Sequence, residues 1–125
     1  MNTNAINWFE IPVKDYQRAK KFYETVFNYE MPEMTVGNAT LGILPHDQEG
    51  GGVGGAIIKD DDYVPSDKGV RIYFEAAEPI EILLDRVSSV GGKVILKKTI
   101  ISEDIGYFAQ FQDTEGNVLA FHSLT

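Results

Sequence analysis

The chain repeats one order of predicted elements twice. In each half a short apolar run leads into an amphipathic helix, and three further strand-like runs follow that helix. The first copy starts with residues 8–13 (WFEIPV) and the second with residues 71–76 (RIYFEA). Such a repeat predicts two βαβββ modules, each a supersecondary unit. The expected fold is α+β: a single domain, residues 1–125, in which bent mixed sheets form a cup and the helices lie outside.

The first module is predicted to span residues 7–59. Asp15 suits the N-cap of a helix, and apolar residues follow it at helical spacing. Asn28 suits the left-handed residue that closes a helix. The segment 46–52 is polar and glycine-rich, so it is predicted to be a loop in which His46 is solvated. The strands of this module are predicted at residues 7–13, 30–34, 39–44 and 53–59.

The second module is predicted to span residues 70–125, after a charged linker at residues 60–69. Pro79 suits the first turn of a helix, and Gly91-Gly92 suits its end. The sequence DTEGN, residues 113–117, predicts a hairpin turn in which Gly116 takes a positive φ. The strands are predicted at residues 70–76, 93–99, 106–112 and 118–122.

Composition and charge exclude several classes of function. The chain has 43% hydrophobic residues and 24% charged residues, which is ordinary for a globular domain. Its net charge of −8 argues against nucleic acid as a partner, because phosphate binding requires clustered Lys and Arg. No apolar run approaches the ~20 residues that span a bilayer, so no membrane partner is expected. The absence of cysteine excludes disulfides and thiolate zinc sites. With no secretory signal visible in residues 1–7, we expect a cytoplasmic protein.

Three segments resemble the vicinal-oxygen-chelate superfamily, which includes glyoxalase I, bleomycin-resistance proteins and extradiol dioxygenases. They are residues 11–27 (IPVKDYQRAKKFYETVF), 90–94 (VGGKV) and 111–123 (FQDTEGNVLAFHS). The chain looks closest to the small, single-domain lactoylglutathione lyase-related group. The resemblance implies a glyoxalase-like cup, a small-molecule ligand and a homodimer. It does not specify an activity, because function depends on the residues of the site.

The resemblance also implies a place for a divalent metal, which relatives hold with His, Glu or Gln from four strands. In this chain those places fall on Trp8, on Gly55 or Ala56, near Arg71, and on Ala120. None of these side chains is a usual metal ligand, and Arg71 is a permanent cation. If the alignment with the metal-ligand positions is shifted by two residues, the strand face is preserved and the positions fall on Glu10, Tyr73 and His122 instead. We therefore expect neither the usual metal site nor another cofactor, and a non-standard metal site is the alternative.

Glu10 and His122 are the candidate catalytic residues. Glu10 lies within an apolar strand, where a carboxylate is costly unless it is paired or functional. It is either a general base or ligand acceptor, or a structural acceptor paired with Arg71 or with backbone N–H groups. His122 is either an acid/base group at the cup rim or a structural histidine at a strand end.

Trp8, Tyr73 and Arg71 are the candidate ligand-binding residues. The two aromatic residues are expected either to form walls that stack on a ligand or to fill the cavity as core. Arg71 either binds an anionic group of the ligand or faces solvent.

The sequence is compatible with three functions. The first is a binding protein that holds a small molecule in the cup without turnover. The second is a lyase or isomerase that abstracts a proton next to a carbonyl, with Glu10 or His122 as the base. The third is a protein-interaction subunit with a closed cup. A ligand screen together with metal analysis separates these three.

Overall fold

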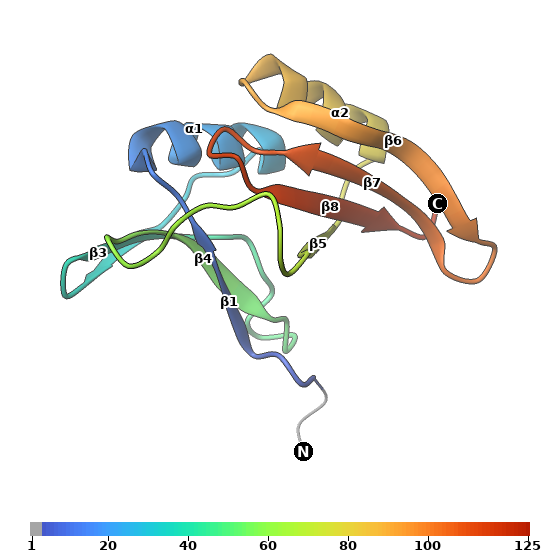
Figure 1. Ribbon diagram of the computed structural model, residues 1–125. Helices are drawn as coiled ribbons and strands as arrows, with labels where there is room; N and C mark the ends of the chain where they lie inside the picture. Colours follow the sequence, from blue (N-terminus) through green and yellow to red (C-terminus); the bar gives the residue numbers. More distant parts are fainter. Residues whose placement is uncertain (1–3) are drawn as a thin grey trace. The chain divides into compact units, whose positions relative to one another are not determined.

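The structure is a computed structural model that describes residues 4–125 (Figure 1). It contains two compact units, one ending at Pro65 and the other beginning at Ser66. Each unit contains one helix and one four-stranded mixed sheet, so the fold is α+β, with the repeated order that the sequence predicts. The two helices have 12 and 10 residues, and no helix within the described residues is long and apolar enough to cross a membrane.

The first unit builds its sheet in the order β1-β4-β3-β2. β1 and β4 run parallel, whereas β3 pairs antiparallel with both β4 and β2. A parallel pair requires a crossover connection, and α1 begins that connection after β1. The elements are β1 (Trp8–Pro12), α1 (Tyr16–Phe27), β2 (Glu33–Val36), β3 (Ala39–Ile43) and β4 (Gly54–Lys59).

Both ends of α1 are as predicted. The Asp15 side chain accepts a hydrogen bond from the Arg18 N–H at 3.1 Å, which satisfies one of the free donors at the helix start. Asn28 has a φ of 53° and donates its N–H to the Glu24 carbonyl. Between these caps one face of the helix is fully buried, and each large apolar side chain on it, such as Phe22 or Val26, stabilises the fold by roughly 1.5–3 kcal/mol. Its buried residues include Ala19, Phe22, Tyr23 and Val26.

The alternation of side chains gives the first sheet two different faces. A Cβ at Gly42 would stand 2.9 Å from the Tyr16 hydroxyl of α1, so this position lies on the helix side. Gly42 is paired through β4 with Ile11, which therefore faces α1 as well. Successive residues of a strand point to opposite faces, so Trp8 and Glu10 lie on the face turned away from α1.

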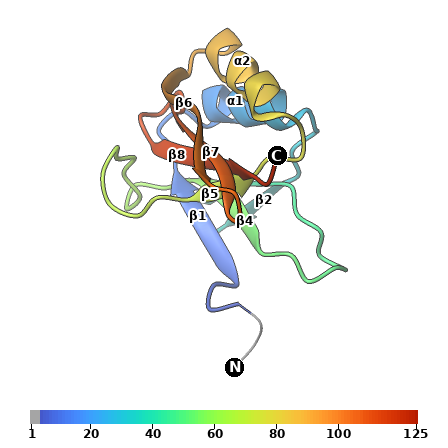
Figure 2. The same ribbon diagram turned by 90° about the vertical axis from the view of Figure 1, so that its right-hand side faces the viewer.

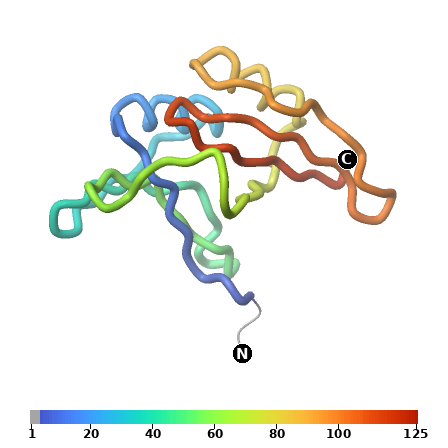
Figure 3. The backbone as a smooth tube through the Cα atoms, viewed as in Figure 1, coloured from blue at the N-terminus to red at the C-terminus, as the bar shows by residue number. Residues whose placement is uncertain are grey.

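The second unit builds its sheet in the order β5-β8-β7-β6. β5 and β8 are parallel, and β7 and β8 form an antiparallel hairpin whose strands run side by side (Figure 3). Figure 2 shows α2 lying along this sheet, and its buried residues Ile80, Leu83, Leu84 and Val87 face the strands. The elements are β5 (Tyr73–Glu75), α2 (Ile80–Ser89), β6 (Lys93–Ser102), β7 (Gly106–Gln112) and β8 (Val118–Ser123).

Several element boundaries differ from the prediction, and those of β1, β3, β4 and β8 differ by one residue at one end or both. The strand predicted at residues 70–76 is only Tyr73–Glu75, because Val70 is 90% exposed and has no core to pack against. β2 begins at Glu33, after Pro32, which lacks an N–H and accepts the Ile43 N–H through its carbonyl. Pro79 is the N-cap of α2 and not part of its first turn. β6 extends to Ser102, beyond the predicted residue 99.

The DTEGN segment is a hydrogen-bonded turn between β7 and β8. One oxygen of Asp113 accepts the backbone N–H groups of Glu115 and Asn117 at 2.8 and 3.0 Å, and the other accepts the Asn117 amide at 3.0 Å. The Asn117 side-chain oxygen in turn accepts the Ser66 N–H at 3.1 Å. Gly116 has the predicted positive φ, 97°. This motif is therefore structural: it closes the hairpin and ties the start of the second unit to it.

Candidate functional site

In the first unit, two aromatic side chains meet the Glu10 carboxylate. The Trp8 indole donates to Glu10 Oε2 at 3.3 Å, since residues two apart on a strand share a face. After β4 the chain turns back with a hydrogen bond from the Tyr63 N–H to the Asp60 carbonyl. This turn places Tyr63 near the same carboxylate, which acts on its hydroxyl. Hydrogen bonding to Glu10, and then the negative charge of Glu10, raise the pKa of Tyr63.

Gly54 lets a second aromatic ring approach Trp8. A Cβ at Gly54 would stand 3.0 Å from Trp8 Cζ3 and 3.1 Å from His46 Nε2, so both rings lie over this glycine. His46 is exposed, as predicted, and its Nδ1 lies 3.3 Å from the Leu44 carbonyl oxygen. We call Trp8, Glu10, His46 and Tyr63 the Glu10 cluster. Periodicity does not reveal the last two members, because both lie in loops.

Glu10 is the one charged side chain that the four strands of the first sheet place on this face. Its cross-strand neighbour is Ala56, and the register carries the same face across β3 and β2. Within residues 4–125 no ion pair to Glu10 is present; the neutral Trp8 indole donates to it, and Tyr63 lies nearby. Trp8 and Tyr63 remain 41% and 37% exposed. The other residues of this face on the four strands are Pro12, Met34, Val36, Ala39, Leu41, Ile43, Gly54 and Ile58.

In the second unit, Tyr73 and His122 lie on one face of neighbouring strands. Tyr73 is paired with Ala120, and His122 lies two residues farther along β8. Phe108 is paired with His122 across β7, and its ring centroid lies 6.4 Å from that of Tyr73. His122 Nε2 lies 2.5 Å from the Ile105 carbonyl oxygen. Because a carbonyl oxygen can only accept, this contact requires the tautomer with a proton on Nε2.

The candidate residues thus fall into two groups. Trp8 and Glu10 belong to the first unit, whereas Arg71, Tyr73 and His122 belong to the second. Arg71 is half-buried and precedes β5. A common cavity for both groups stays a prediction.

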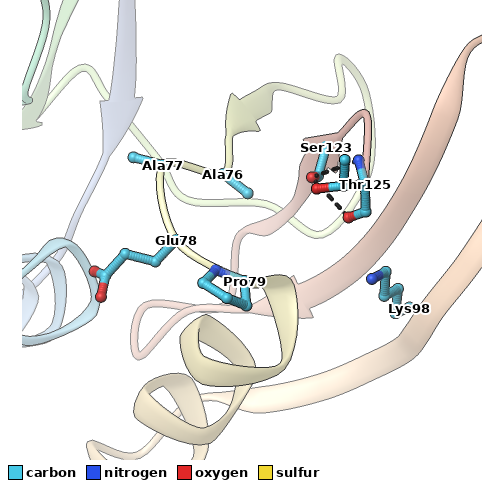
Figure 4. A pocket seen from close by; sticks show the side chains of 7 residues that line it. All are labelled: Ala76, Ala77, Glu78, Pro79, Lys98, Ser123 and Thr125. Atoms are coloured by element: carbon cyan, nitrogen blue, oxygen red, sulfur yellow. Dashed lines mark hydrogen bonds between the residues drawn. The ribbon is translucent and has the colours of Figure 1, made fainter.

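A hollow of about 340 Å³ lies beside the start of α2 (Figure 4). The charged groups at its border have partners: Lys98 pairs with Glu81 at 3.5 Å and lies over the Tyr107 ring, and Glu78 forms a bidentate pair with Arg86. This hollow contains none of the candidate residues. Its lining residues are Ala76, Ala77, Glu78, Pro79, Lys98, Ser123 and Thr125.

The donor chemistry does not fit the metal of the vicinal-oxygen-chelate proteins. Trp8, Ala56, Arg71 and Ala120 offer an indole, two methyl groups and a guanidinium, none of which has a lone pair suited to a divalent cation. Among residues 4–125 no group of three or more His, Asp or Glu side chains is arranged to hold a metal ion.

Comparison with known proteins identifies the family. The model of the Glyoxalase/Bleomycin resistance protein/Dioxygenase superfamily matches residues 5–121. No curated protein matches the chain.

Solved structures share the fold at low sequence identity. A glyoxalase/bleomycin resistance protein from Albidiferax ferrireducens T118 is 17% identical with a TM-score of 0.69, covering 96% of this chain and 98% of its own. A glyoxalase/bleomycin resistance protein/dioxygenase family enzyme from Burkholderia phytofirmans PsJN is 16% identical, with a TM-score of 0.70 and coverages of 95% and 98%. The fosfomycin resistance protein FosX from Listeria monocytogenes is 17% identical, with a TM-score of 0.68 and coverages of 99% and 94%. By the family match over residues 5–121, the chain belongs to the Glyoxalase/Bleomycin resistance protein/Dioxygenase superfamily.

Proposed function

We propose that this protein binds a small molecule at the Glu10 cluster and holds it without chemical turnover. The observation that carries the proposal is the Glu10 carboxylate, which accepts the Trp8 indole N–H at 3.3 Å and lies beside the Tyr63 hydroxyl. Both rings remain partly exposed, so each offers aromatic surface to a ligand. Apolar and aromatic surface with a few placed polar groups is the usual composition of a small-molecule site.

The hydrogen bonds at Glu10 leave acceptor capacity for a ligand. An ionised carboxylate has about four lone-pair positions, and the indole and the phenol use at most two of them. The indole hydrogen bond orients the carboxylate, which reduces the ordering that a ligand has to impose. Tyr73 in the second unit is proposed as a further ligand contact, with His122 as the second polar anchor. Arg71 is proposed to contact an anionic group in a ligand that carries one. We further propose that the protein works as a cytoplasmic homodimer.

The lyase or isomerase alternative requires more than a base. Proton abstraction next to a carbonyl creates an oxyanion that the enzyme must stabilise. In the Glu10 cluster the candidate donors, the Trp8 indole and the Tyr63 phenol, are directed to the carboxylate that would serve as the base and so are not available to that oxyanion. Because the base and the oxyanion would compete for the same two donors, we favour binding over turnover.

The test uses the fact that Trp8 is the only tryptophan of the chain. A screen of neutral, anionic and cationic small molecules, followed by Trp8 fluorescence and by thermal shift, should find ligands that change both signals saturably. Glu10→Gln should weaken their binding by about 10- to 100-fold, since hydrogen bonds to a charged group contribute roughly 1.5–3 kcal/mol.

Glu30→Gln is the matched control, because Glu30 is an exposed carboxylate of the same unit outside the cluster. It should leave binding unchanged. Saturable binding that Glu10→Gln does not weaken would place the ligand elsewhere. Product formation from a bound ligand would favour the lyase or isomerase instead.

A further inference from the structure

The Glu10 face of the first sheet has an unusual charge pattern. Its four strands present one carboxylate among apolar and aromatic side chains, and no Lys or Arg on that face. Lys59, the last residue of β4, alternates onto the α1 side. A single uncompensated negative charge beside aromatic rings is complementary to a compact cation that carries apolar surface.

From this pattern we infer that the ligand of the Glu10 cluster is an organic ammonium ion. The inference rests on the proposed function and names its ligand class. The positive charge would lie beside the Glu10 carboxylate, and its alkyl groups would contact the partly exposed rings of Trp8 and Tyr63. Cations are attracted to the faces of such rings, most strongly to tryptophan.

Neighbouring acidic residues reinforce the preference. Asp60 and Asp62 lie in the same loop as Tyr63 and act on its hydroxyl through their charges. The buried Ala56 beside Glu10 keeps part of the carboxylate's surroundings apolar, which strengthens attraction to a cation. An anionic ligand would meet repulsion from the same groups.

The test compares two molecules of nearly the same shape. Choline has a quaternary ammonium group, and in 3,3-dimethylbutan-1-ol a neutral carbon takes the place of the nitrogen. Choline should change Trp8 fluorescence saturably and bind about tenfold or more tightly than the alcohol, with sodium chloride at equal ionic strength as the blank. Benzoate serves as the anionic probe.

Two variants link the preference to the cluster. Glu10→Gln should reduce choline binding about tenfold or more, whereas Glu30→Gln should not change it. Tyr63→Leu alters an exposed loop residue and not the core, so it should weaken choline binding while the thermal midpoint stays close to that of the wild type.

The outcomes separate the inference from the proposed function. If the alcohol or benzoate binds as tightly as choline and Glu10→Gln weakens that binding, the ammonium assignment is wrong and the binding site stands. If choline fails to bind while another small molecule saturates the Trp8 signal, the assignment is again wrong. If no small molecule changes Trp8 fluorescence or thermal stability, both proposals fail.

Discussion

At the scale of single residues, Tyr63 reports directly on the Glu10 cluster. Hydrogen bonding to the Glu10 carboxylate, the charge of Glu10, burial, and the charges of Asp60 and Asp62 all raise its pKa above the ordinary value of about 10. Because the folded-state pKa is the higher one, the stabilising contact is complete below the unfolded value. It is lost as pH rises through the folded value.

We expect a tyrosinate absorbance titration of the wild type minus that of Tyr63→Phe to show a midpoint above 10. Glu10→Gln removes the negative charge of Glu10 and replaces the carboxylate acceptor by a neutral amide, so the corresponding difference titration should move its midpoint back toward the ordinary value. An unchanged midpoint in the Glu10→Gln background would show that the two side chains do not interact.

Asp113 is expected to contribute strongly to the stability of the fold. Its buried carboxylate accepts the N–H groups of Glu115 and Asn117 and the Asn117 side-chain amide. Asp113→Ala leaves these donors without that acceptor, which should lower the free energy of unfolding by about 2–4 kcal/mol. Urea unfolding measures this change. The exposed Asp104 lies in the turn between β6 and β7, and Asp104→Ala should cost less than about 0.5 kcal/mol.

At the scale of elements, the sequence predicts well where local chemistry decides the structure. The Asp15 and Asn28 caps of α1 and the Gly116 turn depend on neighbouring residues alone, and all three are confirmed. The strand predicted at residues 70–76 is too long, because alternation around Val70 does not reveal that this side chain lacks a packing partner.

The candidate site was only half predictable for a related reason. Trp8 and Glu10 share a strand, so their common face follows from alternation. Tyr63 reaches Glu10 only because a turn at Asp60 folds the loop back after β4. His46 approaches Trp8 only because Gly54 has no side chain. No periodic pattern encodes such contacts between a loop and a strand.

Helix α2 has an electrostatic anchor that makes the stability of the second unit depend on pH. Arg86 donates to both oxygens of Glu78, at 2.5 and 2.9 Å, and this hydrogen bonding lowers the pKa of Glu78. A lowered pKa means that the contribution is present above the unfolded value of about 4.3 and is lost as pH falls through the folded value.

We therefore expect the loss of stability between pH 5 and pH 3 (about the range set by that pKa) to be smaller in Glu78→Gln than in the wild type. Chemical unfolding at several pH values measures this slope. Glu75→Gln alters a nearby exposed carboxylate with no resolved ion pair within the described residues, so it should retain the wild-type slope. Equal slopes for Glu78→Gln and the wild type would contradict the assignment.

At the scale of the whole molecule, the donor chemistry gives an expectation for metal content. The places that match the vicinal-oxygen-chelate metal ligands hold Trp8, Ala56, Arg71 and Ala120, whose side chains do not coordinate divalent cations. Elemental analysis of protein purified without chelators should find Zn, Ni, Fe and Mn well below one ion per chain. A near-stoichiometric metal would contradict this expectation and would direct attention to Glu10, Tyr73 and His122.

The edge of the second sheet supports the proposed homodimer. β6 pairs only with β7 among the described strands, and it carries exposed isoleucines along its length and in the turn that follows. Exposed apolar side chains on an unpaired edge strand favour pairing with another chain, and small proteins usually pair symmetrically. These residues are Ile95, Ile100, Ile101 and Ile105.

Light scattering should accordingly give twice the chain mass of 13.9 kDa at micromolar concentrations. A lysine in place of Ile100 adds like charges at a two-fold contact and buries a polar group, so Ile100→Lys should shift the protein toward the monomer. Val70→Lys introduces the same charge at a 90% exposed residue of the same unit and should leave the mass unchanged.

A wild-type mass of one chain at every concentration would refute the dimer. A dimer insensitive to Ile100→Lys would move its interface away from β6, since a buried lysine facing its own symmetry copy cannot be accommodated without cost.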